Sequence, residues 1–461
     1  MGQQIPVVQI ETPKKNKKNS TSIVTRSYTG LFRNVRLLFT GFLLAIFFFI
    51  PWINWNDRQS VLWDFPNGRF YIFNTTFWPQ DFILLSALLI ICAFGLFFLT
   101  VLAGRVWCGY SCPQSVWTWI FLRIEHLTQG ERNQRIKLQN APWSVNKAIR
   151  VFAKHFLWLL VGLISAVTFV GYFTPIRELS VNLMQFQATA LSVFWVFFFT
   201  LGTYLAAGFL REKVCTHMCP YSRFQSVMFD DSTLLVSYDA KRGEPRGTRK
   251  KGQETETMGS CIDCTLCVQV CPTGIDIRDG LQLGCINCGA CVDVCNEVMD
   301  KMNYPRDLIS YTSERALAGG KTHFLRPRLV GYAITLLVMF IGLGWGLSER
   351  APMRMDVIKD RTMFRENLDG YYENTYMIKV INKTQEPRSY QISLKDAPHF
   401  QLNKEHILSL QPGEIGHLPV TVTQTQALTE SFVPVVFAVH DIAKPEYVLT
   451  TKNNFTAPVG Q

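Results

Sequence analysis

The residues best suited to chemistry are eight of the 13 cysteines, which form two runs with the spacing C-x-x-C-x-x-C-x-x-x-C. The first run is Cys261, Cys264, Cys267 and Cys271, and the second is Cys285, Cys288, Cys291 and Cys295. Pro272 follows the first run and completes the bacterial signature for a 4Fe-4S cluster. Three thiolates two residues apart can surround one cube from a tight loop, whereas the fourth must come from elsewhere. The spacing therefore predicts two 4Fe-4S clusters.

The two runs are expected to exchange their fourth ligands, as in two-cluster ferredoxins. One cluster would take Cys261, Cys264, Cys267 and Cys295, and the other Cys285, Cys288, Cys291 and Cys271. Zinc sites use two pairs of ligands and do not produce two interlocked runs of four. Asn296 replaces the proline after the second run, but ligation needs only the thiolate. The runs indicate one-electron transfer without specifying a reaction.

A second pattern, C-x-x-x-C-P, occurs at Cys108 to Pro113 and again at Cys215 to Pro220. Each copy follows a long apolar run, which indicates duplication of a two-helix unit. In a helix, i and i+4 lie on one face, so Cys108, Cys112, Cys215 and Cys219 could meet beneath a membrane. His217 and Met218 would add ligands that suit copper. Alternatively, the thiols are small apolar residues and the prolines end helices, but the repeated spacing favours a redox or metal role.

Five long apolar runs predict a membrane protein with five transmembrane helices. These runs lack the polar face of a soluble core helix. They extend over Leu37 to Ile53, Phe82 to Ala103, Phe156 to Phe173, Ala190 to Leu210, and Leu329 to Leu347.

The distribution of Lys and Arg predicts the orientation. Residues 1–36, 104–155 and 211–328 carry 7, 8 and 16 of them, against 2 in 54–81 and 1 in 174–189. The amino terminus and the cluster segment are therefore expected in the bacterial cytoplasm, and the tail outside. The cluster thiols would lie in the reducing compartment, and residues 348–461 contain no cysteine. The basic residues of the cytoplasmic segments also account for the net charge of +11, so no nucleic acid partner is expected.

We expect the domains to follow these boundaries. They are a basic cytoplasmic tail (1–36), a four-helix membrane region (37–210), a cytoplasmic segment (211–328) with a ferredoxin domain at about 255–300, the fifth helix (329–347), and an exported domain (348–461). The tail shows no cleavable signal peptide and is expected to contact anionic lipid.

The exported segment changes to a period of two. Tyr376, Ile378 and Val380 alternate with other residues, as do 390–394 and 418–422, and 432–439 is a longer apolar strand candidate. Pro412-Gly413 marks a turn between strand candidates. Short strands separated by turns predict a β-sandwich of immunoglobulin-like architecture.

A haem protein is a weaker alternative. None of the five expected spans contains a histidine, with His155 at the edge of the third and His126 in the preceding loop. A pair of axial histidines is therefore hard to assemble.

Taken together, these features resemble the cytochrome c oxidase accessory proteins called CcoG, FixG or RdxA, which are similar to the NapH and NosR polyferredoxins. The resemblance covers roughly residues 25 to 461. It implies a bacterial inner-membrane protein that reduces Cu(II) to Cu(I) for assembly of the cbb-type haem-copper oxidase. Implied partners are the oxidase assembly machinery, copper chaperones or transporters, and an unnamed cytoplasmic electron donor. The oligomeric state is open, with a homo-oligomer as one outcome.

Two other functions remain open. One is a quinol-linked electron conduit of the NapH or NosR type. The other is an assembly scaffold whose β-domain docks the oxidase while the clusters are structural or sensory. The C-x-x-x-C-P cysteines could bind copper, ligate another cluster or act as redox thiols.

Overall fold

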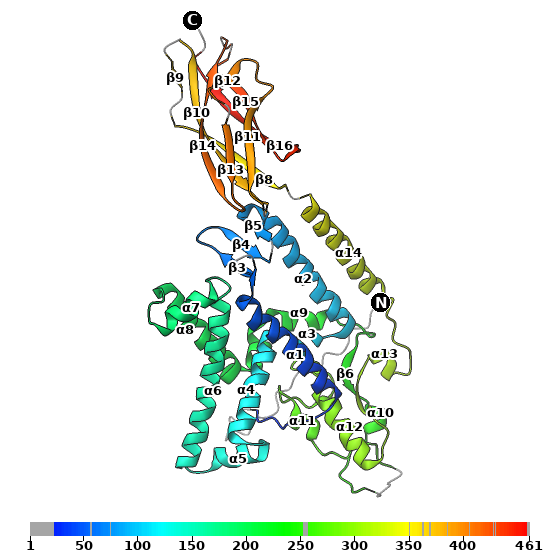
Figure 1. Ribbon diagram of the computed structural model, residues 1–461. Helices are drawn as coiled ribbons and strands as arrows, with labels where there is room; N and C mark the ends of the chain where they lie inside the picture. Colours follow the sequence, from blue (N-terminus) through cyan, green and yellow to red (C-terminus); the bar gives the residue numbers. More distant parts are fainter. Residues whose placement is uncertain are drawn as a thin grey trace. The chain divides into compact units, whose positions relative to one another are not determined.

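The structure, a computed structural model, describes residues 23–458 apart from short gaps at 56–57, 74, 252–256, 350, 362–363, 368–369, 385, 405, 427 and 429. The basic residues between Lys14 and Lys18 lie outside the described residues. The chain forms two compact units, Met1–Asn67 with Gln80–Leu343, and Gly68–Pro79 with Gly344–Gln461. Figure 1 shows the ribbon coloured along the sequence.

Five helices in the described part of the chain are long and apolar enough to cross a membrane, which confirms the expected number. Two helices continue into a short segment of different winding: α1 into η1 (Ile50–Trp52) and α8 into the π-helix η3 (Ala206–Leu210). The five helices are α1 (Leu31–Phe49), α2 (Phe82–Ala103), α6 (Val145–Val170), α8 (Ala190–Leu205) and α14 (Pro327–Ser348).

Three spans begin earlier than their apolar runs, the fifth, at Pro327, by only two residues. The first begins at Leu31, because the buried side chain of Arg36 turns into the protein and donates to the Ser115 carbonyl (3.4 Å). The third begins at Val145 and therefore contains His155, so the expectation that no span holds a histidine is wrong. His155 Nδ1 lies 2.9 Å from Tyr204 Oη. Among the described spans, no other contains a histidine.

Shorter elements connect the spans. They are β1 (Asn54–Trp55), β2 (Arg58–Gln59), β3 (Val61–Asp64), η2 (Pro79–Asp81), α3 (Val106–Tyr110), α4 (Pro113–Gln129), α5 (Arg132–Asn140), α7 (Ile176–Met184), the π-helix η4 (Val214–Met218), α9 (Pro220–Phe224) and η5 (Gln225–Val227).

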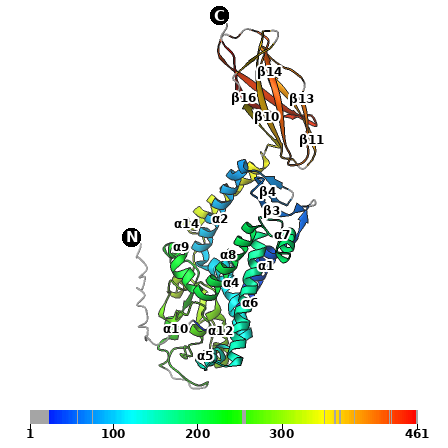
Figure 2. The ribbon, with the colours of Figure 1, turned by 90° about the vertical axis from the view of Figure 1, so that its left-hand side faces the viewer.

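Helix α4 packs against α6 and η3, and α6 packs against α8 (Figures 1 and 2). The Phe121 and Trp158 rings stack with centroids 5.1 Å apart. Beside them the buried carboxylate of Glu125 pairs with Arg135 and, at 2.5 Å, with Arg211. A buried carboxylate is tolerated only when it is paired in this way. The pairs fix the segment that leads from η3 into the second C-x-x-x-C-P motif.

The ferredoxin module comprises residues 235–312, which is wider than the range expected from the cysteines. Its strands β6 (Leu235–Tyr238) and β7 (Ile309–Thr312) pair antiparallel, with Leu235 opposite Thr312. Between them lie α10 (Ala240–Gly243), α11 (Leu266–Val270), η6 (Ile277–Asp279) and α12 (Ala290–Met302). The strand pair was missed because neither segment alternates strongly enough to be recognised alone.

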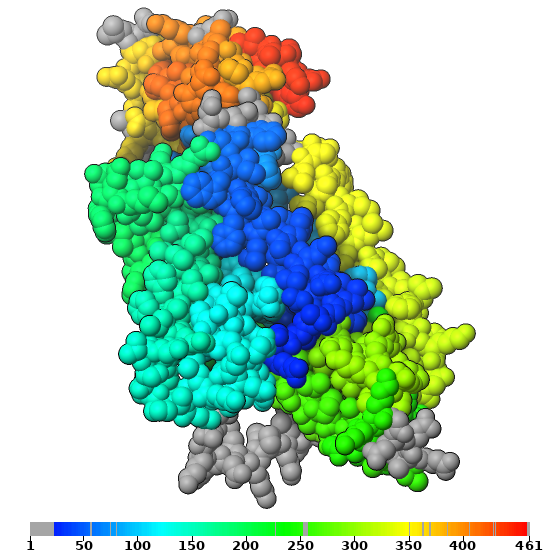
Figure 3. All heavy atoms as spheres, turned by 60° about the horizontal axis from the view of Figure 1, so that its bottom comes forward, coloured from blue at the N-terminus to red at the C-terminus, as the bar shows by residue number. Residues whose placement is uncertain are grey.

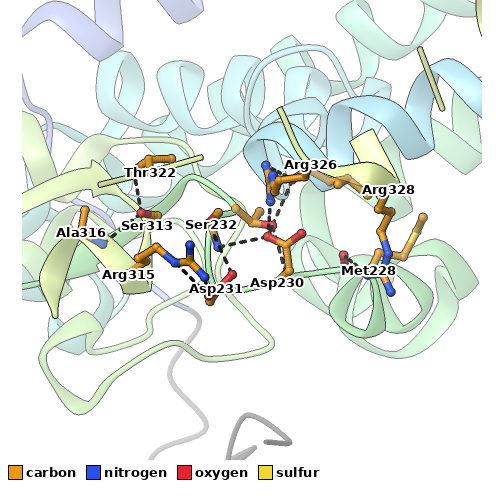
Figure 4. A network of polar contacts seen from close by, with 12 residues as sticks. Met228, Asp230, Asp231, Ser232, Ser313, Arg315, Ala316, Thr322, Arg326 and Arg328 are labelled. Atoms are coloured by element: carbon orange, nitrogen blue, oxygen red, sulfur yellow. Dashed lines mark hydrogen bonds and ion pairs between the residues drawn. The ribbon is translucent and has the colours of Figure 1, made fainter. Parts of the chain in front are cut away.

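A polar network joins the two segments that flank the module, residues 228–233 and 313–328, to each other and to α2 (Figure 4). Asp230 pairs with Arg326 just before α14, and Asp231 pairs with Arg315 of α13 (Glu314–Leu317) at 2.6 Å. Arg326 and Thr233 also donate to the carbonyl of Val101 near the end of α2. These contacts fix the points where the chain leaves and re-enters the membrane region.

The second unit is a β-sandwich, as the alternation predicted. One sheet has the order β12-β14-β10-β8 with β9 paired to β10, and the other has the order β13-β11-β15-β16. Alternate residues of β10, Tyr376, Ile378 and Val380, are fully buried between the sheets. Gly413, at a φ of 69°, lies in the turn before β14.

The strands of this unit are β4 (Arg69–Ile72), β5 (Thr75–Phe77), β8 (Met353–Lys359), β9 (Arg365–Glu366), β10 (Tyr372–Asn382), β11 (Arg388–Lys395), β12 (Phe400–Leu402), β13 (His406–Leu410), β14 (Ile415–Gln424), β15 (Phe432–Asp441) and β16 (Lys444–Thr456).

Candidate iron-sulfur and thiol site

The two cysteine loops, residues 261–267 and 285–291, share one backbone pattern. The residue before the second cysteine of each loop is left-handed, with φ of 50° at Asp263 and 52° at Asn287. The residue after it is left-handed as well, at Thr265 (55°) and Gly289 (71°). Such turns wrap the chain and direct successive backbone N–H groups to one side, where they favour an anionic group. The repeated wrapping fits a cluster bound by thiolates.

Two cavities separate the eight thiols into two sets. One cavity, with about 370 Å³ of empty space, is lined by the first set, Cys261, Cys264, Cys267 and Cys295. The other, with about 360 Å³, is lined by the second set, Cys271, Cys285, Cys288 and Cys291, and shares Cys267 in its wall. The grouping follows the exchange of fourth ligands, and the sulfur-only donor sets fit two 4Fe-4S clusters.

Burial opposes ionisation of these thiols while no metal is bound. It raises the pKa of Cys267, Cys285 and Cys295 to about 12. An unligated thiol in these cavities would therefore be neutral, and it loses its proton when it binds metal. When bound, the clusters would supply one-electron transfer.

The structure explains why the residue after the second cysteine run, Asn296, is not proline. Cys271 is extended before Pro272, and α11 ends at Val270, because the residue before proline disfavours helical backbone. Asn296 instead lies inside α12, which continues to Met302. Its side-chain oxygen accepts the backbone N–H of Asp307 at 2.8 Å.

We expected each C-x-x-x-C-P motif to be a helical turn with both cysteines on one face. This expectation is wrong. Cys108 lies in α3 and Cys215 in η4, but Cys112 and Cys219 are extended residues immediately before α4 and α9. The following proline causes this break, because it restricts the preceding residue to extended backbone and is itself favoured at the first helical position. Both motifs share this local structure.

The four cysteines of the motifs nevertheless come together, and we call them the four-thiol group. Burial raises the pKa of Cys215 to about 12, and Cys112, Cys108 and Cys219 each raise it further through electrostatic repulsion. Burial likewise raises the pKa of Cys108, against a hydrogen bond from Gln225. None of the 13 cysteines forms a disulfide, so the four sulfurs are free.

His217 and Met218 both face solvent, and Met218 is 65% exposed. His217 Nδ1 lies 2.7 Å from Thr216 Oγ1. Across the described ranges, no three His, Cys, Asp or Glu side chains are placed to hold a single metal ion. The cluster thiols line cavities, and the four-thiol group would have to close around an ion to bind it.

The first motif packs directly on the second cysteine loop. A Cβ at Gly109 would lie 2.7 Å from the Ile286 carbonyl oxygen and 3.0 Å from the Cys288 Cα. Tyr110 donates to the Cys288 carbonyl (3.3 Å), and Asn287 Nδ2 donates to the Ala103 carbonyl (3.2 Å). Only glycine allows this close approach of two backbones.

Arg105 lies between the second set and the four-thiol group. Its side chain is 6% exposed and donates to the backbone carbonyls of Leu283 (2.5 Å) and Ser222. The guanidinium interacts electrostatically with Cys108, Cys285 and Cys215. A fixed positive charge at this place stabilises negative charge on either side. Sequence reasoning missed Arg105, because its partners Leu283 and Ser222 lie in distant segments of the chain.

Replacing Gly109 with alanine is expected to destabilise the module by about 1–3 kcal/mol, because the added methyl group meets fixed backbone atoms. The measurement is the thermal midpoint at which the visible absorption of the clusters is lost. Gly95→Ala is the control, since a Cβ there meets nothing within 4 Å. Equal midpoints for the two variants would show that the close packing does not contribute.

Comparisons with known proteins find the same modules. Family models match residues 210–314 as a 4Fe-4S dicluster domain, residues 85–118 as a 4Fe-4S binding domain, and residues 343–458 as the immunoglobulin-like fold at the C-terminus of FixG. A crystal structure of a FixG-related protein from Vibrio parahaemolyticus is 27% identical, covers 24% of this chain and 99% of its own, and has a TM-score of 0.22.

Three curated relatives match most of the chain. Protein RdxB of Cereibacter sphaeroides is 39% identical, over 88% of this chain and 87% of RdxB. Nitrogen fixation protein FixG of Rhizobium meliloti is 35% identical, over 86% and 84%. Protein RdxA of Cereibacter sphaeroides is 36% identical, over 81% and 82%.

The fold and the site define an integral membrane iron-sulfur protein of the electron-transfer class. Its ferredoxin module and immunoglobulin-like domain are joined by apolar helices in one chain. The chain belongs to the family of RdxB, FixG and RdxA. The resemblance inferred from the motifs is thereby confirmed.

Proposed function

We propose that this protein is a cupric reductase of the bacterial inner membrane, which supplies Cu(I) for assembly of the cbb-type haem-copper oxidase. The cysteines of the first and second sets would hold two 4Fe-4S clusters. The four-thiol group would bind copper where it is reduced. The observation that carries the proposal is the packing of the first motif on the second cysteine loop, with Arg105 between them.

Two properties of the chain support this role. Cys108 and Cys215 are half-buried rather than fully exposed, and soft thiolates favour Cu(I) over Cu(II). Each tenfold preference for Cu(I) raises the potential of the copper couple by about 59 mV in a one-electron step. Low-potential electrons would then reduce copper spontaneously.

The partners and the orientation belong to the same proposal. The ferredoxin module would face the cytoplasm, where an unnamed donor reduces it, and the immunoglobulin-like domain would face the periplasm. The oxidase assembly machinery and copper chaperones or transporters would be the protein partners. The uneven distribution of Lys and Arg supports this orientation.

Replacing Cys215 and Cys219 together with serine is expected to reduce the rate of Cu(II) reduction at least about tenfold, because it removes half of the soft ligands. The iron-sulfur spectrum should not change, since neither residue belongs to a cluster set. Reduction is followed anaerobically as Cu(I) formed by protein whose clusters have been reduced. Cys92→Ser, which alters an exposed thiol on α2, is the control. Unchanged copper reduction in the double variant would refute the site.

A second function of the four-thiol group is favoured by one comparison. The match to a 4Fe-4S binding domain covers residues 85–118 and so includes Cys108 and Cys112. The group would then ligate another cluster and extend the electron path without touching copper. Loss of iron from the double variant would support this alternative.

A further inference from the structure

A cavity in the first unit opens beside the four-thiol group and has about 800 Å³ of empty space when the solvent at its mouth is included. Its wall comes from the segment before α1, from α1 and α4, from the turn after η3, and from the ferredoxin module. Cys215 is the member of the four-thiol group that lines it. Thr273 and Ile286, which lie next to the second set of cysteines, line it too. A ligand in this cavity would therefore contact both a soft sulfur and the surroundings of the second set.

The charge of the wall is strongly positive, and we call this space the arginine cavity. One carboxylate, that of Glu212, lines it. Burial lowers the pKa of His126, which also lines it, so the imidazole is neutral at pH 7. The cavity is lined by five arginines: Arg26, Arg33, Arg36, Arg123 and Arg211.

Two of the five arginines have no ion pair in the described part of the chain, whereas Arg33 interacts electrostatically with Asp293. Arg211 pairs with Glu125, which already pairs with Arg135. In the described part of the chain, Arg36 and Arg123 have no ion pair, and Arg123 instead lies over the Trp119 ring at 5.8 Å. A concave wall of one sign concentrates ligands of the opposite sign.

The cavity adjoins a wider hollow with about 1380 Å³ of empty space, open solvent included, which shares Arg26, Arg33 and Arg123 in its wall. Arg132, Lys301 and two carboxylates, those of Glu131 and Glu297, also line the hollow, so its wall is still positive in balance. On the face in Figure 3, the dark-blue segment around α1 lies between the cyan surface of α4 and α5 and the green ferredoxin module. The arginines thus line a route from this surface toward Cys215.

We propose that copper enters the arginine cavity as an anionic chelate, with carboxylate or thiolate ligands that give the complex a negative charge, and is transferred there to Cys215. The cationic wall would repel the aquated Cu(II) ion and attract a negatively charged complex. A soft sulfur at the wall then competes with the chelating ligand for copper.

This inference rests on the proposed function. In the step itself, one electron leaves the reduced protein and converts Cu(II) to Cu(I). The chelating ligand departs, and the Cys215 thiol releases its proton to water as the copper–sulfur bond forms. The reductant is the protein after reduction by a low-potential donor, so no further co-reactant is needed.

The test compares two copper substrates on intact, anaerobically reduced protein: Cu(II) citrate, which is anionic, and Cu(II) ethylenediamine, which is cationic. Replacing Arg33 and Arg123 together with glutamine should lower the initial rate with citrate at least about tenfold. The rate with ethylenediamine should stay the same or rise. High salt should reduce the citrate rate of the wild type, because ions screen the wall. Arg150→Gln removes one exposed charge outside the cavity and is the control.

Calorimetry with citrate alone gives a second measurement that requires no copper. Citrate should bind the wild type and Arg150→Gln, and bind the double arginine variant at least about tenfold more weakly. Intact cluster absorption in every variant shows that the fold is preserved.

Three outcomes would overturn the inference. If the arginine substitutions change the rates with both chelates equally, the cavity does not select copper complexes by charge. The proposed reductase function would still stand. Failure to reduce either chelate, with clusters that ferricyanide still oxidises, would remove the proposed function and this inference with it. Phospholipid that copurifies stoichiometrically and is lost from the arginine variant, with no citrate binding, would assign the cavity to lipid phosphate.

Discussion

Anaerobically purified protein is expected to contain about eight irons and eight acid-labile sulfides per chain, because the eight thiols line two cavities in sets of four. Replacing Cys288 with alanine should reduce the iron content to about four, since the second set then lacks one of its four ligands. Chemical analysis of iron and sulfide, with electron paramagnetic resonance of the reduced protein, measures both results.

Cys92→Ala is the matched control for this experiment, because it removes a thiol from α2 and should retain all the iron. Firmly bound zinc, or no more than about four irons after full reconstitution of the wild type, would contradict two clusters. About twelve irons would instead indicate a further cluster in the four-thiol group.

A reporter that is active only in the periplasm should work when fused after Gln461 and fail when fused after Lys250. The physical reason is that segments rich in Lys and Arg stay in the cytoplasm during insertion, and five spans place the two fusion points on opposite sides. The result is close to all or none. Reporter activity at both sites is compared after correction for expression level.

A cytoplasmic reporter at the same two positions serves as the control and should give the reverse pattern. Activity of the periplasmic reporter at Lys250 and not at Gln461 would overturn the orientation, and with it the proposed source of electrons.

The parts that the sequence predicted well are those set by local spacing. The period of two in β10 placed Tyr376, Ile378 and Val380 in the core of the sandwich, because alternate residues of a strand face the same side. Two expected spans, Phe82 to Ala103 and Ala190 to Leu210, have the bounds found in the structure. In both cases the signal lies within one continuous stretch of the sequence.

The C-x-x-x-C-P motifs show where a local rule was applied wrongly. A spacing of four suggested one helical face, but the prolines at positions 113 and 220 impose extended backbone on Cys112 and Cys219. Proline restricts the preceding residue to extended backbone, and this restriction outweighs the helical spacing of the two cysteines. The thiols are instead brought together by tertiary packing of the two motifs.

Arg36 and Arg105 could not be assigned a role from the sequence, because their environment depends on contacts between distant segments. Arg36 donates to a carbonyl of α4, and Arg105 donates to carbonyls of the segments at Leu283 and Ser222. The arginine cavity is likewise formed by residues from several elements. A single sequence contains no signal for such long-range meetings.

Under the proposed function, a newly made chain would have to load iron before it could handle copper. The first motif rests on the backbone of Ile286 and Cys288 through Gly109, and that loop holds its wrapped form around the second set of cysteines. An unloaded loop loses the ligand bonds that fix this surface, because metal binding and local folding are coupled. The surface on which Gly109 and the first motif pack would then form only after the second set has bound iron. Such an order would keep copper away from a chain that has no electron supply.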